Sequence, residues 1–222
     1  MNNKELAIKY KRQTASRYLP VASSEITSKI MEADFYSVST KLDGHLYLLS
    51  YNGKDLELIN HGGNSIADLP LLNEALTILK ANCKEVLLAG ELYLHSEGKR
   101  TRNFDLVAAL TEKSPDIRFA AFDIISFEGK DVNFDIKVLN EKLSSLLDGG
   151  ISIHPVSSSL VESRTDILDL YENIVVKSNN EGLVIRSNNG PIYKLKPLIT
   201  LDAVILGYAE IESGNSHVTL EM

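Results

Sequence analysis

The stretch EGLVIRSNNGPIYKLK, residues 181–196, contains two runs rich in β-branched and apolar residues on either side of the turn-forming sequence SNNG. This composition predicts two neighbouring strands. Lys194 and Lys196 are two residues apart, so both side chains project from one face, next to whatever Glu181 faces. Two ammonium groups on one face repel each other unless an anion lies between them. The pattern therefore fits either a solvent-facing strand edge or a phosphate-binding strand pair.

A corner of the chain at residues 41–44, KLDG, provides another lysine between the strand-like runs FYSVST and HLYLLSY. Because Gly44 has no side chain, backbone and ligand can approach each other closely there. The corner alone favours a surface hairpin that carries Lys41 and Asp43. Its combination with residues 181–196 favours a binding site.

Strand-like runs outnumber helical ones along the rest of the chain. Strands are predicted at residues 35–41, 45–51, 56–60, 86–94, 118–125, 151–156, 182–187, 191–196 and 201–208, with a hairpin over 45–60. Helices are predicted at residues 24–33, 69–83, 139–148 and 164–178. Since the strands cluster instead of alternating strictly with helices, the expected fold class is α+β with largely antiparallel sheets.

The charge and composition exclude several classes of protein. A net charge of −7 over 222 residues argues against a protein that coats nucleic acid. Residues 1–20 are the exception, with five basic side chains against one acidic, and predict either a phosphate-contacting arm or a solvated, partly frayed helix. One cysteine, Cys83, excludes an intrachain disulfide and a cysteine-cluster zinc site. No apolar run suits a membrane span or a signal peptide, so we expect a cytoplasmic protein.

The order of the short motifs is more informative than any one of them. The motifs are KLDG (41–44), GEL (90–92), FD (122–123), EGLVIR (181–186) and YKLK (193–196). In this order they resemble the nucleotidyltransferase motifs of the covalent lysyl nucleotidyltransferases, and most closely those of ATP-dependent DNA ligases. The resemblance spans roughly residues 35–208. It implies two largely antiparallel β-sheets with flanking helices that enclose a nucleotide cleft.

The same resemblance implies a division of the chain. It suggests a basic, helical lead-in at 1–34, a nucleotidyltransferase (adenylation) domain at 35–200 and the start of a truncated OB-like domain at 201–222. The run LDAVILGY (201–208) resembles the point where such ligases enter their OB domain. We expect this fragment to adenylate itself slowly and to need the missing domain for strand sealing. The implied partner is nicked DNA, or RNA, bound by a monomer through regions partly absent from this chain.

On the phosphate side of the implied site, Lys41 would be the nucleophile that attacks the α-phosphate of ATP and forms lysyl-AMP. Lys194 and Lys196 would contact that phosphate, and Glu181 would help to bind the catalytic Mg²⁺, with Asp43 as its neighbour. A free lysine has a pKa near ~10.4 and is almost wholly protonated at pH 7. Nearby cations favour its neutral, nucleophilic form, and they also stabilise the charge on the reacting phosphate.

On the adenosine side, the resemblance implies that Ser39 helps to read the base and that Glu91 holds the ribose hydroxyls. Phe122 would stack on the adenine, with Phe119 as the alternative. Stacking of an aromatic ring on a base contributes about 1 to 3 kcal/mol and tolerates any base. Asp123 is expected either to orient a neighbouring group or to cap a loop.

Two further motif positions leave alternatives open. His61 and Asn64, in HGGN, lie where these ligases carry a short nucleotide- or strand-contacting motif, but HGGN is also typical of a turn. Leu46 replaces the arginine of the usual KxDGxR pattern, and His45 or Arg186 is expected to fill part of its function. The alternatives to a DNA ligase are an RNA ligase, an mRNA-capping guanylyltransferase, or a non-catalytic nucleotide- or nucleic-acid-binding module.

Overall fold

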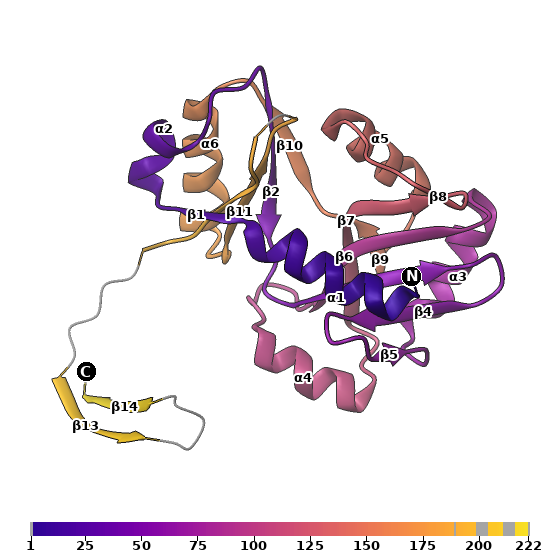
Figure 1. The fold of residues 1–222 in the computed structure, drawn as a ribbon, viewed down its shortest axis with the longest axis horizontal. Helices are drawn as coiled ribbons and strands as arrows, with labels where there is room; N and C mark the ends of the chain where they lie inside the picture. The colour runs from indigo at the N-terminus through magenta and orange to yellow at the C-terminus, as the bar shows by residue number, and fades with distance from the viewer. Residues whose placement is uncertain (1, 189, 199–203, 211–215, 222) are drawn as a thin grey trace.

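The computed structural model describes residues 2–188, 190–198, 204–210 and 216–221. Two β-sheets lie side by side, and each is covered by its own helices (Figure 1). All strand pairs within them are antiparallel except for one parallel pair in each sheet. The predicted α+β fold class with largely antiparallel sheets is confirmed.

The smaller sheet carries both halves of the stretch at 181–196. Its strand order is β1 (Leu19–Val21), β12 (Tyr193–Leu195), β11 (Gly182–Arg186), β2 (Tyr36–Lys41) and β10 (Ser158–Val161). Only β1 and β12 are parallel. The 3₁₀ turn η2 (Ser23–Glu25) leads into α2 (Ile26–Lys29), while α6 (Arg164–Leu170) continues as the π-helical η3 (Tyr171–Lys177). Ile26, Tyr36, Ile167 and Leu183 belong to one buried cluster, so these helices cover one face of the sheet.

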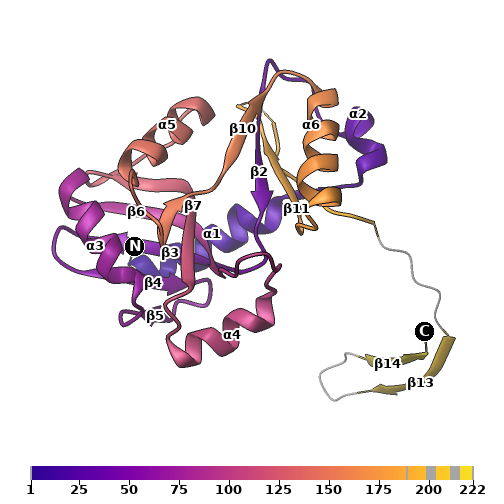
Figure 2. The ribbon, with the colours of Figure 1, turned by 180° about the vertical axis from the view of Figure 1, so that it is seen from behind.

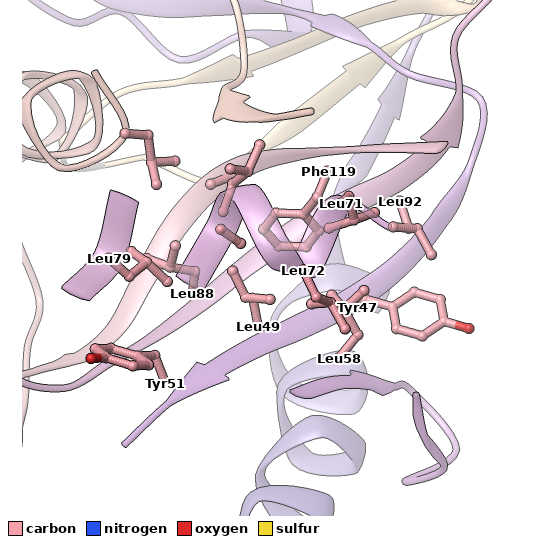
Figure 3. Close-up of a cluster of buried hydrophobic side chains, with 14 of the residues drawn as sticks. Tyr47, Leu49, Tyr51, Leu58, Leu71, Leu72, Leu79, Leu88, Leu92 and Phe119 are labelled. Atoms are coloured by element: carbon pink, nitrogen blue, oxygen red, sulfur yellow. The ribbon is translucent and has the colours of Figure 1, made fainter. Parts of the chain in front are cut away.

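The larger sheet holds the main hydrophobic core. Its strand order is β5 (Ser65–Ile66), β4 (Leu56–Asn60), β3 (His45–Tyr51), β6 (Val86–Leu94), β7 (Ile117–Phe127) and β8 (Lys130–Asp131), and β9 (Ile153–Pro155) pairs in parallel with β7. One face packs against α3 (Leu71–Asn82), α4 (Asn103–Glu112) and α5 (Ile136–Leu146). Figure 3 shows this packing, with side chains of α3 against Leu49, Leu88 and Phe119 of the sheet.

The opposite face of the larger sheet is covered by α1 (Asn3–Gln13). The Asn2 side chain accepts the Glu5 amide and the Glu5 carboxylate accepts the Asn2 amide, which is a capping box that fixes where the helix starts. Ala7 is buried against Leu48 and its neighbours on the sheet. The helix is therefore capped and packed, in contrast to the frayed terminus that was one of the two alternatives for this segment.

The N-terminal segment connects the two sheets. After α1 the chain passes through the 3₁₀ turn η1 (Ala15–Arg17) and enters the smaller sheet as β1. Figure 1 shows α1 crossing from the smaller sheet to the larger one, and Figure 2 shows the same arrangement from behind. Residues 19–21 pair with residues 193–195, so part of the predicted lead-in belongs to the same sheet as the EGLVIR and YKLK motifs.

Most of the predicted elements appear where the sequence indicates them. The first eight predicted strands all form, and the hairpin over residues 45–60 pairs Tyr47 with Asn60 and Tyr51 with Leu56. The helix predicted at 24–33 is shorter, and α4, β1, β5, β8 and β10 were not predicted. Strand β13 (Val204–Glu210) pairs with β14 (Ser216–Glu221) in a hairpin. Residues 199–203 lie outside the described residues, so the boundary expected at residue 200 stays a prediction.

Candidate active site

A cavity of about 470 Å³ lies where the two sheets meet. The smaller sheet and its C-terminal extension contribute Ser39, Lys41, Val184, Arg186, Lys194 and Lys196 to its lining. The larger sheet contributes Leu46, Glu91 and Phe122. Six residues predicted to bind the nucleotide therefore line one space, although they come from four strands and the segment after β12. They are Ser39, Lys41, Glu91, Phe122, Lys194 and Lys196.

Lys41 lies at the end of β2, where the chain turns towards β3. Gly44 is the last residue of this turn. A side chain could not be accommodated there, because a Cβ on Gly44 would lie 2.2 Å from the Leu92 carbonyl oxygen. The turn is therefore pressed against β6, which carries Glu91. This close approach brings the end of the smaller sheet's β2 next to the larger sheet.

Glu181 holds two of the site lysines at once. The Lys41 ammonium donates to Glu181 Oε2 at 2.7 Å, and Lys196 Nζ lies 2.6 Å from Oε1. Lys41 is paired with Gly182 in the β2–β11 register, which explains why the preceding glutamate reaches it. The Glu181 carboxylate thus bridges Lys41 and Lys196, and the anion expected between Lys194 and Lys196 stays a prediction. Lys194, opposite Val184, lines the same cavity.

Glu91 lies opposite Leu46 in the register of β6 and β3. Burial raises its pKa from an ordinary value of 4.5 to about 7, and the negative charge of Glu181 adds to the increase, whereas the charge of Lys41 opposes it. Near neutral pH this carboxyl group therefore exists in both protonation states. In either state its oxygens can accept hydrogen bonds from hydroxyl groups of a ligand.

Phe122 is held at the cavity by Arg186. The guanidinium donates to the Phe122 carbonyl oxygen at 2.7 Å and lies 5.2 Å from the centroid of its ring. It also donates to the Tyr18 hydroxyl at 3.0 Å. Phe119, the alternative stacking residue, is fully buried in the core of the larger sheet. The ring available to a ligand is therefore that of Phe122.

Asp123 ties α1 to the larger sheet. The Tyr10 hydroxyl donates to its carboxylate at 2.6 Å, and the Ile124 amide donates to the other oxygen at 2.9 Å. Burial, together with the negative charge of Asp123, raises the pKa of Tyr10 well above its ordinary value. Of the two roles expected for Asp123, the structure has it orienting a neighbouring side chain.

The remaining predicted residues are divided between two hollows. His45, Leu46 and His61 line the cavity, whereas Asn64 is not among its lining residues. Asp43 faces a smaller hollow that it shares with Lys41 and Glu181. There the Arg100 guanidinium lies 3.3 Å from the Asp43 carboxylate. The structure thus places Glu181 and Asp43 beside one hollow, each paired with a basic side chain.

The acidic side chains permit only a limited metal site. Across residues 2–188, 190–198 and the two terminal strands, no three His, Cys, Asp or Glu side chains cluster in a way that could hold an ion. A Mg²⁺ bound to phosphate oxygens and water needs only one or two protein carboxylates. Glu181, with Asp43 as a neighbour, fits that kind of site, provided that a lysine is displaced from the carboxylate.

Sequence reasoning missed several residues that line the cavity, namely Lys11, Ala15, Tyr18, Asn103, Val156 and Val184. Val184 could have been found, because alternation along β11 places it on the same face as Arg186. The basic excess of residues 1–20 pointed to their segment but to no particular residue. Lys11 and Tyr18 reach the cavity only because α1 and η1 cross between the sheets.

Residues 16–196 match the family model described as the ATP dependent DNA ligase domain. The chain belongs to this family. The match includes every motif from KLDG to YKLK and extends upstream to η1, which contributes to the cavity of this ligase-family domain. The search of curated proteins found no match.

Solved structures of ligases share the fold of this ligase-family domain. A Lig E DNA ligase has a TM-score of 0.60 at 18% identity, covering 90% of this chain and 82% of the other. The ATP-dependent DNA ligase of bacteriophage T7, in complex with ATP, has a TM-score of 0.59 at 17% identity, covering 91% and 80%. An archaeal ATP-dependent RNA ligase has a TM-score of 0.54 at 13% identity, and this chain spans 47% of its length.

Among the described residues, no helix has the length and apolar character needed to cross a membrane.

Proposed function

We propose that this domain carries out the adenylation step of an ATP-dependent DNA ligase and forms lysyl-AMP at Lys41. The observation that supports this most strongly is the position of Lys41 at the junction of two hollows, within hydrogen-bond distance of Glu181 and beside Lys194 and Lys196. ATP would lie in the cavity between the sheets. Its adenine would stack on Phe122, with Ser39 beside the base and the ribose hydroxyls at Glu91.

The chemical step follows from these positions. Lys41 Nζ must lose a proton before it can attack, and Glu181 is the carboxylate within hydrogen-bond distance of that ammonium. The neutral amine then attacks the α-phosphorus, and the bond to pyrophosphate breaks with its electron pair leaving on the pyrophosphate. Lys194 and Lys196 stabilise the negative charge that develops on the α-phosphoryl oxygens.

Glu181 would help to hold the Mg²⁺ implied by this chemistry, with Asp43 as a neighbouring ligand. When bound, the ion would compensate the charge of the pyrophosphate leaving group. The Glu181 carboxylate is paired with two lysines, Lys41 and Lys196. A Mg²⁺ ion would bind to this carboxylate by replacing one of these ammonium groups.

We propose nicked DNA as the polymer that receives AMP at a 5′-phosphate, followed by attack of a 3′-hydroxyl and sealing. The DNA ligase family match supports DNA over RNA. An RNA ligase is the second candidate, because Leu46 stands where the DNA ligase pattern has arginine and an archaeal RNA ligase shares the fold. Nicked DNA and nicked RNA, offered to the adenylated protein, distinguish the two by which one accepts AMP.

We further propose that the protein acts as a cytoplasmic monomer. A reducing compartment suits a chain whose one cysteine, Cys83, is partly buried and free. A repair pathway would be a natural setting for nick sealing.

The adenylation proposal is tested by intact-mass spectrometry after incubation with Mg²⁺ and either ATP or GTP. We expect ATP to add the mass of one AMP to the wild-type protein and to the control Lys54→Ala, whose lysine is exposed in the β3–β4 turn. Lys41→Ala should gain nothing. A gain with GTP alone would point to a capping-type enzyme, and no gain with either nucleotide would favour a binding module.

A further inference from the structure

The last turn of α1 carries Lys11, a cavity-lining lysine that lies outside the motifs from KLDG to YKLK. Lys11 is half-buried and lines the cavity together with Leu46, His61 and Glu91. The helix that carries it is fixed at both ends. Asn3 donates to the Ser50 hydroxyl at 2.7 Å, and the residue before Lys11, Tyr10, is hydrogen-bonded to Asp123. The position of Lys11 is therefore set by the packing of α1 on the larger sheet.

Glu91 has an apolar residue directly across the sheet. In the β3–β6 register its partner is Leu46, which is 8% exposed and lines the same cavity. A leucine supplies neither a positive charge to the buried carboxylate nor a hydrogen bond to a nucleotide. Any cation on this side of the cavity must come from another element.

Two of the cations that line the cavity are already engaged with other groups. Lys41 is paired with Glu181, and Arg186 donates to the Phe122 carbonyl oxygen and to Tyr18. The positive charges of Lys41 and Lys11 both lower the pKa of Glu91. The ion pairs found within the described part of the chain do not involve Lys11.

We propose that Lys11 is an ATP-binding residue, and that its ammonium supplies the positive charge beside the ribose and phosphates of the nucleotide that Leu46 cannot supply. The inference rests on the proposed function of the cavity as the ATP site. It adds a residue from outside the family-like motifs, and it explains how the site functions with leucine at position 46. The ligand class is a nucleoside triphosphate.

Equilibrium binding of α,β-methylene-ATP, which cannot transfer AMP, tests this inference without relying on catalysis. Calorimetric titration of the wild type, Lys11→Met, Lys11→Arg and Lys9→Met gives four dissociation constants. We expect Lys11→Met to weaken binding about tenfold, as loss of one charge-assisted contact does. Lys11→Arg keeps the charge and should bind nearly as well as the wild type. Lys9→Met, on an exposed position of the same helix, should leave binding unchanged.

A second change restores the charge from the opposite strand. Leu46→Arg, introduced into Lys11→Met, places a cation directly across from Glu91 and should recover most of the lost affinity. If Lys11 had only a structural role, Leu46→Arg on β3 would not restore nucleotide binding. Thermal unfolding of each variant reports any loss of folding.

Two results would overturn the inference, and they are distinguishable. If the wild type binds the analogue and Lys11→Met binds it equally well, Lys11 is not a nucleotide contact, and the proposed function stands. If the folded wild type does not bind the analogue at all, both the ATP site and the role of Lys11 are wrong.

Discussion

Glu91 is a cavity residue whose surroundings shift its pKa strongly. Its folded-state pKa of about 7 exceeds its ordinary value of 4.5, mainly because burial disfavours the charged form. The folded protein therefore binds more protons than the unfolded chain between these two values. Stability contributed by this group must fall as the pH rises through that window, in contrast to a salt-bridged carboxylate.

We expect the Glu91→Gln variant to lack this decrease in the free energy of unfolding between pH 4.5 and about 7. One unit of pKa corresponds to about 1.4 kcal/mol, so the shift from 4.5 to about 7 costs the folded protein about 3 kcal/mol once both states are ionised. Urea unfolding at about pH 5 and about pH 8 should show the wild type losing more stability than the variant. Equal pH dependence of the two proteins would show that Glu91 titrates normally.

Among the helices, α1 leads directly into the segment that lines the cavity and reaches the smaller sheet. It contacts the larger sheet through Ala7 and through the hydrogen bond from Tyr10 to Asp123. The chain then continues through Tyr18, which accepts a hydrogen bond from Arg186 of the smaller sheet. The N-terminal segment thus helps to hold the two walls of the cavity together.

The Tyr10–Asp123 bond should be a measurable part of this attachment. We expect Tyr10→Phe to destabilise the protein by about 1–3 kcal/mol, because it leaves a partly buried carboxylate without one of its donors. Asp123→Ala, which removes the acceptor, and the double variant complete a thermodynamic cycle measured by urea unfolding. Additive effects of the two single changes would mean that the hydrogen bond contributes nothing to stability.

The sequence could predict elements whose pattern is local. Alternation along YKLK placed Lys194 and Lys196 on one face, and both line the cavity. In α3, the buried residues Leu71, Leu72, Ala75 and Leu79 follow helical spacing, so the helix was predicted with nearly correct ends. These patterns depend only on the period of a strand or helix.

Other elements gave no such local signal. Helix α4 buries Leu106 and Ala109 but exposes Phe104 and Val107, so its apolar residues form no single stripe. Strand β1 has three residues and pairs with a strand more than 170 positions later, which no short pattern indicates. The same non-local packing brings Lys11 and Tyr18 to the site, and this is why sequence reasoning did not find them.

For the whole molecule, the net charge of −7 limits how the domain can hold nucleic acid. The basic side chains of residues 1–20 and the lysines of the cavity are local exceptions to this net negative charge. Binding to a nicked duplex must therefore depend on a few phosphate contacts, which release counterions and weaken as salt increases.

We expect the affinity for a nicked duplex to fall more than about tenfold between ~50 mM and ~200 mM salt. Fluorescence anisotropy with a labelled nicked duplex measures this, with an intact duplex of the same sequence as the control. Tight binding that is insensitive to salt would contradict the charge argument.

We propose that Lys41, among the lysines around the cavity, becomes covalently attached to AMP. Tandem mass spectrometry of proteolytic peptides from the ATP-treated protein tests it most directly, because it locates the adduct on one side chain. We expect AMP on the Lys41 peptide alone. An adduct on Lys11, Lys194 or Lys196, or no adduct in a protein that binds ATP, would contradict it.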